Sequence, residues 1–210
     1  MNRQETNGAT RIRVDQKLIA EMVTPSSRLL DVGCGDGELL DLLVRDRQVD
    51  GRGIELSQQG VNTCVSRGLA VVQGDAETDL QNYPDDAFDF ALLSQTLPAI
   101  FDVKGVLREL LRIGRCAVVS FPNFGYWRVR ADLLFRGRSP VSNNLPHAWY
   151  ESPNIRFFTL TDFMNLLDEL DLTAQQIVTI DHQGHARTRR QIGHWTNLAT
   201  EQAIFLIGRS

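Results

Sequence analysis

The sequence contains few cysteines, no long apolar run and no surplus of basic residues, and each shortage argues against a class of protein. No stretch of about 18 apolar residues occurs, so no membrane-spanning helix is expected. The 22 Lys and Arg residues are outnumbered by 26 Asp and Glu residues, and the formal net charge of −4 does not attract nucleic acid. The first ten residues contain no apolar core of a secretory signal. We therefore expect a cytoplasmic protein without a membrane or nucleic-acid partner.

Metal and disulfide sites are also not expected. The three cysteines form no CxxC pair and fall in or beside predicted core elements, which favours reduced, buried thiols; they are Cys34, Cys64 and Cys116. His182 and His185 have a spacing that zinc sites use. No carboxylate cluster accompanies them in their Gly- and Arg-rich loop, however, so we predict solvated side chains and no bound metal.

A glycine-rich turn between a predicted strand and a predicted helix is the first functional signal. Residues 29–32 are an apolar run, Gly33, Gly35 and Gly37 alternate with Cys34 and Asp36, and a helical pattern resumes at residue 38. The spacing G-x-G-x-G differs from the G-x-G-x-x-G of dinucleotide sites, so it favours a nucleoside without a pyrophosphate. A sharp turn that binds no ligand would use the same glycines.

Two acidic residues close the next two predicted strands. Glu55 lies 20 residues beyond Gly35, where a carboxylate at the end of the neighbouring strand can accept both ribose hydroxyl protons. Asp75 ends the third predicted strand and is followed by Ala76. Each acid alone could cap the helix that follows it. Acids at three successive strand ends, counting Asp31 beside the glycine turn, favour a binding site.

The order of predicted elements favours a doubly wound α/β fold, because strands alternate with amphipathic helices and so form a parallel sheet with right-handed crossovers. The expected strands are 29–32, 51–56, 69–73, 88–93, 115–121, 172–180 and 202–207. The last two flank a charged loop, 181–197, and are expected to form an antiparallel edge hairpin. We predict a mostly parallel seven-stranded sheet in a single domain, residues 12–210, preceded by a disordered N-terminus, residues 1–11.

One long segment interrupts this pattern after the fifth strand. Residues 122–158 are rich in Pro, Gly, Asn and aromatic residues and have no long periodic pattern. Such a segment at the carboxyl edge of a parallel sheet is typical of a lid or a binding surface. Its arginines are interleaved with Trp127 and apolar residues; they are Arg128, Arg130, Arg136 and Arg138. This stretch is either a solvated helix face or the contact with a protein partner.

Several segments of the chain resemble the methionine biosynthesis protein MetW family. They are residues 12–15, the glycine turn with its flanks at 29–40, and residues 93–97, 119–127, 140–142 and 149–155. The run Ser120-Phe121-Pro122-Asn123-Phe124-Gly125 and the later Trp149-Tyr150 with Pro153-Asn154-Ile155 are the most specific of these. The sequence departs from the family pattern at Pro98, where we expect Gln, at His147, where we expect an aromatic residue, and at Ala76-Glu77, where Leu-Asp is more usual.

The resemblance implies a class I methyltransferase-like fold and a homoserine O-acyltransferase as the partner. The glycine turn and the acids resemble the S-adenosylmethionine site of class I methyltransferases. In that resemblance the turn at Gly33, Cys34 and Gly35 lies under the methionine part and Asp31 lies near its ammonium. Glu55 binds the ribose, Asp75 the adenine amino group and the Ala76 N–H a ring nitrogen. Independently of the resemblance, the end of the fourth predicted strand, Ser94-Gln95-Thr96, is expected to border the ligand cleft. The expected cofactor is S-adenosylmethionine or S-adenosylhomocysteine.

Two functions remain open at this stage. The first is an accessory subunit that binds the cofactor and activates or regulates the acyltransferase; the alternative is a methyltransferase acting on a small-molecule acceptor. Methyl transfer needs in-line positioning, plus a base only where the acceptor carries a proton. The candidate bases are His147, Tyr126, Tyr150 and Glu151, each also explained by a structural or interface role, so no catalytic residue is assigned.

Overall fold

The computed structural model describes residues 13–141, 145 and 148–209, so the predicted disordered N-terminus and His147 lie outside the described residues. The strands are β1 Arg28–Val32, β2 Asp50–Glu55, β3 Ala70–Gln73, β4 Phe88–Ser94, β5 Gly114–Pro122, β6 Leu172–Ile180, β7 Ala186–Arg189 and β8 Gln202–Arg209. The α-helices are α1 Val14–Met22, α2 Glu38–Arg47, α3 Gln58–Ser66, α4 Val103–Ile113, α5 Trp127–Ala131, α6 Leu160–Glu169 and α7 His194–Ala199. Short 3-10 turns lie at Leu80–Asn82 and Leu97–Ala99.

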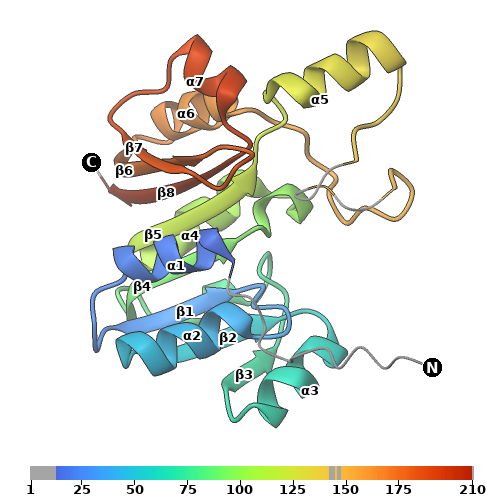
Figure 1. Cartoon of the computed structure of the whole chain (residues 1–210). Helices are drawn as coiled ribbons and strands as arrows, with labels where there is room; N and C mark the ends of the chain where they lie inside the picture. The colour runs from blue at the N-terminus through green and yellow to red at the C-terminus, as the bar shows by residue number, and fades with distance from the viewer. Residues whose placement is uncertain (1–12, 142–144, 146–147, 210) are drawn as a thin grey trace, which may run out of the picture.

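The strands form one mixed sheet with the order β3-β2-β1-β4-β5-β8-β6-β7 (Figure 1). The first five are parallel, and β8 is antiparallel to both β5 and β6. The predicted mostly parallel α/β fold with an antiparallel C-terminal part is therefore confirmed. The strand count of seven was one short, because β7 arises inside the loop predicted at 181–197 and pairs with β6 as the outermost strand.

Helices cover both faces of the sheet, which makes it doubly wound. Leu29 of β1 packs in one buried cluster with residues of α1 and α2, including Ile19 and Leu40. The next residue, Leu30, faces the opposite way and packs with α4 and α6. This alternation follows from the two-residue period of a strand. In Figure 1, α1 and α2 lie in front of the strands, and α4 and α6 lie behind them.

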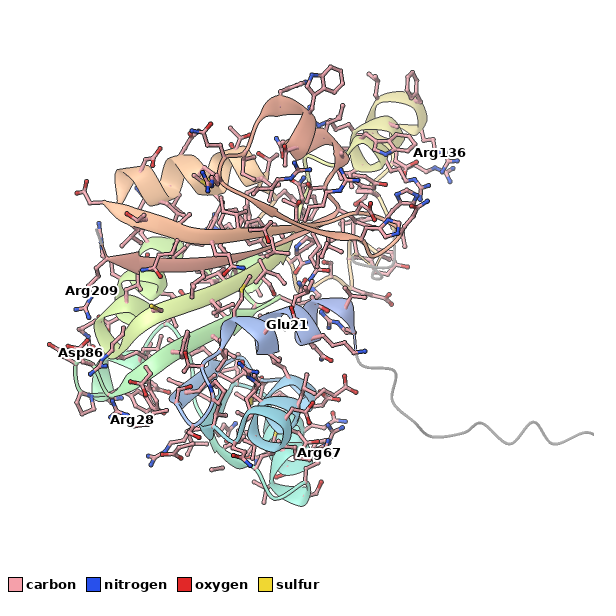
Figure 2. All side chains as sticks on the ribbon, turned by 60° about the vertical axis from the view of Figure 1, so that its left-hand side comes forward. Glu21, Arg28, Arg67, Asp86, Arg136 and Arg209 are labelled. Atoms are coloured by element: carbon pink, nitrogen blue, oxygen red, sulfur yellow. The ribbon has the colours of Figure 1, made fainter. Side chains whose placement is uncertain are left out.

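The edge of the sheet where the parallel strands begin and the edge where they end, here called the carboxyl edge, carry different residues. At the edge where the parallel strands begin, Arg209 at the end of β8 forms an ion pair of 2.5 Å with Asp86, and Arg28 at the start of β1 donates to the Asp86 carbonyl oxygen. Figure 2 labels these three residues at one end of the sheet. The opposite, carboxyl edge carries the ends of β1, β2, β3, β4 and β5, where ligands of open parallel sheets bind.

The insertion after β5 contains a helix, which corrects the prediction of an irregular segment. α5 continues as a π-helix over Asp132–Arg136, and Figure 1 shows this helical arm projecting away from the sheet. The insertion is fixed at its ends. Asn123 is buried, and its amide nitrogen donates to the carbonyl oxygens of Asn197 and Thr200 while its amide oxygen accepts from Gly125 and Leu160 N–H. The specific Pro-Asn-Phe-Gly match thus has a structural role.

The return of the insertion to the sheet involves one of the departures from the family pattern. The carbonyl oxygen of Pro98 accepts hydrogen bonds from the N–H groups of Ile155 and Arg156, both at 2.9 Å. The Arg156 guanidinium also donates to the Phe101 carbonyl oxygen at 2.8 Å. These contacts attach the end of the insertion to the turn after β4, beside the carboxyl edge.

Thr159→Ala is expected to destabilise the protein modestly through the start of α6. The Thr159 hydroxyl and the Asp162 carboxylate form a reciprocal capping box that satisfies two helix N–H groups. Loss of such a cap costs about 1 kcal/mol, or about 2–4 °C in Tm for a chain of this size. Thermal denaturation measures the shift, and Thr188→Ala on exposed β7 is the control. An unchanged Tm for Thr159→Ala would show that the cap does not contribute to stability.

Candidate functional site

The glycine turn between β1 and α2 adopts a conformation that other residues would strain. Gly33, Gly35 and Gly37 all have positive φ angles, of 71°, 59° and 80°. A Cβ atom at Gly33 would also lie 2.6 Å from Cγ2 of Thr96, so the turn packs tightly on the segment after β4. The turn is held to β2 by hydrogen bonds from the N–H groups of Gly33 and Cys34 to the Ile54 carbonyl oxygen. Its backbone is thus preorganised at the carboxyl edge.

Glu55 connects the glycine turn to the next helix. One carboxylate oxygen accepts from the Gly35 N–H at 2.9 Å and the other accepts from the Ser57 N–H at 2.8 Å. Each carboxylate oxygen retains further acceptor capacity. Gly60 of α3 allows this close packing, because a Cβ there would lie 2.7 Å from the Gly35 carbonyl oxygen and 2.8 Å from Cγ of Glu55. Glu55 therefore braces the turn and still has lone pairs for a ligand.

Asp31 is the buried acid of the site. It lies in β1, two residues before Gly33, and is only 1% exposed. Burial, followed by the nearby Glu55 carboxylate, raises the pKa of Asp31 from 3.8 to about 7. No described residue donates a hydrogen bond to its carboxylate. A carboxyl group held at this pKa favours a cationic partner, because a neighbouring positive charge stabilises the ionised form.

The loop after β3 is ordered by its own carboxylates. The Asp75 carboxylate accepts the Glu77 N–H at 2.9 Å, and the Asp75 N–H donates to the Asp79 carboxylate. The Ala76 N–H has no hydrogen-bond acceptor among the described residues. Glu77 reaches in turn to the start of α4, where it accepts the N–H groups of Phe101 and Asp102. Glu77 of the unusual Ala76-Glu77 pair thus connects the loop after β3 to the segment between β4 and α4.

Ser94 lies at the same edge, but its hydroxyl forms a sideways hydrogen bond of 3.1 Å with Ser120 of β5. The next residue, Gln95, has a positive φ of 60° and also donates to the Ser120 hydroxyl. Gln95 lines a cavity of about 570 Å³ together with Asp15, Asn154 and Glu201. The structure therefore brings the predicted residues to one edge, with a separate cavity alongside them.

The cysteines and the described histidines have local contacts of their own. All three cysteines are free thiols, and the Sγ atoms of Cys34 and Cys64 are 3.9 Å apart. Burial raises the pKa of both of these thiols. His185 pairs with the Asp181 carboxylate at 3.3 Å. In the part of the chain that the structure describes, no group of three His, Cys, Asp or Glu side chains could hold a metal ion.

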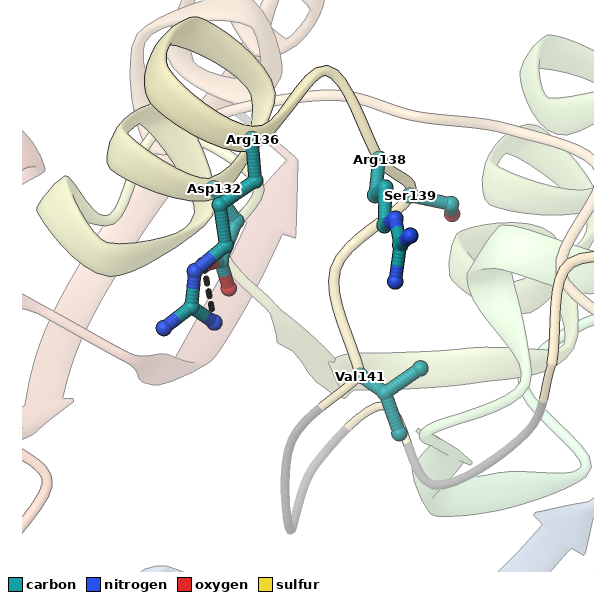
Figure 3. Close-up of a pocket in the computed structure, with 5 residues that line it drawn as sticks. All are labelled: Asp132, Arg136, Arg138, Ser139 and Val141. Carbon is teal, nitrogen blue, oxygen red and sulfur yellow. Dashed lines mark ion pairs between the residues drawn. The ribbon is translucent and has the colours of Figure 1, made fainter.

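The arginines of the insertion differ in their contacts. Arg130 donates to the Gly125 carbonyl oxygen at 2.6 Å, and the Arg128 guanidinium lies over the Trp127 ring at 5.4 Å from its centre. Arg136 pairs with Asp132 at 3.1 Å. Figure 3 shows this pair beside Arg138 at a surface cavity of about 490 Å³. Arg130 is therefore a structural residue of the arm.

One residue beside the predicted site, Leu56, is not indicated by the sequence, whereas Thr96 belongs to the segment expected to border the ligand cleft. Leu56 follows Glu55 and is 66% exposed, and its carbonyl oxygen accepts from Gln73, so it places an apolar side chain beside the β2 and β3 ends. The hydroxyl of Thr96 lies 3.4 Å from the Gly33 carbonyl oxygen. No clear signal in the sequence marks Leu56, because its exposure is a property of the folded structure.

The fold is that of S-adenosylmethionine-dependent methyltransferases. A methyltransferase from Thermotoga maritima matches with a TM-score of 0.67 and 20% identity, over 93% of this chain and 87% of that one. The [4+2]-cyclase SpnF matches with a TM-score of 0.65 and 21% identity, over 92% of this chain and 80% of that one. These likenesses establish the fold. Because they include a cyclase, they leave the reaction open.

The chain belongs to the family described as methionine biosynthesis protein MetW, which matches residues 13–207. The bifunctional methionine biosynthesis protein MetXA/MetW of Rhodopirellula baltica is 36% identical over 180 residues. That match covers 81% of this chain and spans 29% of the length of the relative. None of the described helices is long and apolar enough to cross a bilayer.

Proposed function

We propose that this protein binds S-adenosylmethionine or S-adenosylhomocysteine and works as an accessory subunit that activates or regulates a homoserine O-acyltransferase in the cytoplasm. The observation that carries the cofactor part is the convergence of the glycine turn, Glu55 and Asp31 on one edge of the sheet. The turn offers a close approach to backbone, Glu55 has spare lone pairs for ribose hydroxyls, and the buried Asp31 suits an ammonium group.

The adenine end of the proposed ligand fits the β3 loop. The unpaired Ala76 N–H can donate to a ring nitrogen, the Asp75 carboxylate can accept from the exocyclic amino group, and Leu56 can pack on the ring face. Ser94, at the end of β4, would border the ligand through its backbone, because its hydroxyl already forms a hydrogen bond with Ser120.

Support for a partner comes from the relative in Rhodopirellula baltica, whose name joins MetXA to MetW in one bifunctional protein of methionine biosynthesis. The family resemblance implies that this partner is a homoserine O-acyltransferase. Two activities carried on one chain in one organism are often carried by partners elsewhere. The projecting arm of the insertion supplies exposed apolar side chains for such a contact, among them Leu134 and Phe135. Binding of a ligand related to the pathway's product could then report its level to the acyltransferase through coupled binding.

The direct experiment is co-expression of the chain with a homoserine O-acyltransferase from the same host. Co-purification of the two proteins, and a higher rate of acyl transfer in the pair than in the acyltransferase alone, are expected. Failure of the two to co-purify at micromolar concentrations would contradict the partner assignment. Failure of the chain alone to bind S-adenosylhomocysteine in calorimetry would contradict the cofactor assignment separately.

Methyl transfer to a small acceptor is the second candidate function. The cavity of about 570 Å³ beside Gln95 favours it, because that volume lies next to the proposed cofactor and is large enough for a small molecule. Tyr150 and Glu151, two of the four candidate bases, are exposed. Production of S-adenosylhomocysteine from S-adenosylmethionine in the presence of cell metabolites would support this function, and its absence would favour the accessory role.

Binding of S-adenosylhomocysteine is expected to weaken as the pH falls below about 7, by up to tenfold per pH unit. The reason is that an ionised Asp31 pairs with the ligand ammonium, whereas the free protein binds a proton there with a pKa of about 7. Above pH 7 the carboxyl group is already ionised and the affinity levels off. Calorimetry across this pH range measures the slope.

The Asp31→Asn protein provides the test of that assignment. It should bind more weakly at pH 8 and lose the pH dependence, while Asp36→Asn, in the same turn but exposed, should keep it. A slope that persists in Asp31→Asn would assign the proton to another group.

A further inference from the structure

A further cavity lies between the start of the arm, the end of β6 and the start of β8, away from the glycine turn. It has a volume of about 230 Å³ and is lined by segments far apart in the sequence. Tyr126 and Arg128 come from the start of the arm, His182 follows β6, and Glu201 precedes β8. Val129 and Val141 provide apolar walls.

The buried Tyr126 hydroxyl is the first indication that the cavity binds a ligand. Tyr126 is 2% exposed, and its buried hydroxyl oxygen has no hydrogen bond of full geometry among the described residues, although the Trp127 side chain interacts with it. A buried hydroxyl without a full hydrogen bond has a cost in stability, and such groups are rare in folded proteins. A polar atom of a bound molecule in the cavity would remove that cost.

The cavity wall carries charged side chains of both signs. Glu201 and Arg128 do not form an ion pair with each other. Glu201 is half-buried, and no described residue donates a hydrogen bond or forms an ion pair with its carboxylate. Burial raises the pKa of Glu201, with Arg128 and then His182 opposing the shift. The other acid on the wall, Asp132, is already neutralised by Arg136 at 3.1 Å. Glu201 and Arg128 are therefore the opposite charges available to a ligand.

We propose that this cavity binds a free α-amino acid, with its ammonium on Glu201, its carboxylate on Arg128 and His182, and a polar atom on the Tyr126 hydroxyl. A zwitterion satisfies both signs at once, whereas an amine or a carboxylate alone would leave one charge of the site unpaired. The volume is below the range of about 300–1,000 Å³ typical of pockets for drug-sized ligands, as expected for a metabolite of amino-acid size.

This site is distinct from the proposed cofactor site but adjoins it. Glu201 and His182 also line the neighbouring cavity of about 570 Å³, which extends to Gln95 at the end of β4. None of Tyr126, Arg128 and Glu201 is among the residues assigned to the cofactor. Amino-acid binding therefore stands or falls independently of cofactor binding.

The first experiment is a thermal-shift screen of the whole protein with the protein amino acids and L-homoserine, each at about 10 mM, since a ligand that binds only the folded state raises Tm. At least one amino acid is expected to raise Tm. Calorimetry then compares it with its decarboxylated and deaminated analogues, which should each bind about tenfold or more weakly, because each leaves one charged side chain unpaired.

Matched variants assign the contacts. Glu201→Gln and Arg128→Met should weaken the amino acid about tenfold or more, and Tyr126→Phe about fivefold. Glu169→Gln, which changes the same residue type as Glu201→Gln at an exposed position outside the cavity, should leave it unchanged. An unchanged circular-dichroism spectrum and an unchanged Tm in the absence of ligand verify that the variants fold. The proposal is overturned if no amino acid binds, if either analogue binds equally well, or if the variants bind like the unchanged protein.

Discussion

The Glu55→Ala protein is expected to bind S-adenosylhomocysteine about 10- to 100-fold more weakly than the unchanged protein. The substitution removes the acceptor of the ribose hydroxyls, and hydrogen bonds to a charged group contribute about 1.5–3 kcal/mol. It also removes the brace on the glycine turn, since the carboxylate accepts the N–H groups of Gly35 and Ser57. Calorimetry measures the loss directly.

Ligand analogues can separate these two contributions. If Glu55 contacts the ribose, an analogue lacking a ribose hydroxyl should lose less affinity on going from the unchanged protein to Glu55→Ala than S-adenosylhomocysteine does. An equal loss for both ligands would mean that Glu55 acts only as a brace. Asp162→Ala removes another carboxylate that accepts a backbone N–H, in the cap of α6, and should leave affinity unchanged. Undiminished binding by Glu55→Ala would show that the ribose lies elsewhere.

Replacing Leu134 and Phe135 together by alanine is expected to weaken the complex with the acyltransferase at least about thirtyfold. These side chains are 76% and 81% exposed at the end of the helical arm, so their truncation should not destabilise the fold. Buried apolar anchors at protein interfaces cost about 2 kcal/mol or more when truncated. A pull-down with titrated acyltransferase, supported by calorimetry, measures the change.

Trp195→Ala is the matched control for the arm, because Trp195 of α7 is also strongly exposed but lies outside the insertion. It should leave the complex unchanged, and all these proteins should keep their affinity for S-adenosylhomocysteine. Arg130 is a poor choice for such a test, since it supports the arm through the Gly125 carbonyl oxygen. If the double variant still binds the acyltransferase normally, the partner contact lies outside the arm. The arm would then be better explained as a lid that covers an acceptor site.

The sequence could predict elements whose pattern is local. α4 spans Val103–Ile113, where apolar residues recur at helical spacing in the sequence between an Asp cap and a glycine. β6 likewise spans the predicted Leu172–Ile180. The three glycines of the turn were also readable, since their alternation indicates a backbone that requires positive φ angles.

Elements that depend on distant partners could not be predicted in the same way. β7, Ala186–Arg189, has no alternating apolar pattern and is a strand only because its backbone pairs with β6. The position of β8 between β5 and β6 depends on pairing with β5, whose residues lie far earlier in the chain, such as Cys116 opposite Gly208. α5 was hidden by the Pro, Gly and Asn residues around it, although its own residues support a helix.

The sequence by itself determined the α/β class, the glycine turn and the acids at successive strand ends, because strand period, helix spacing and turn chemistry are properties of neighbouring residues. Only the tertiary structure decided that Glu55 binds the glycine turn, that Asp31 is buried enough to raise its pKa to about 7, and that Tyr126 meets Glu201 at one cavity. Those features depend on the packing of segments far apart in the chain, which sets burial and hydrogen bonding and which no local pattern encodes.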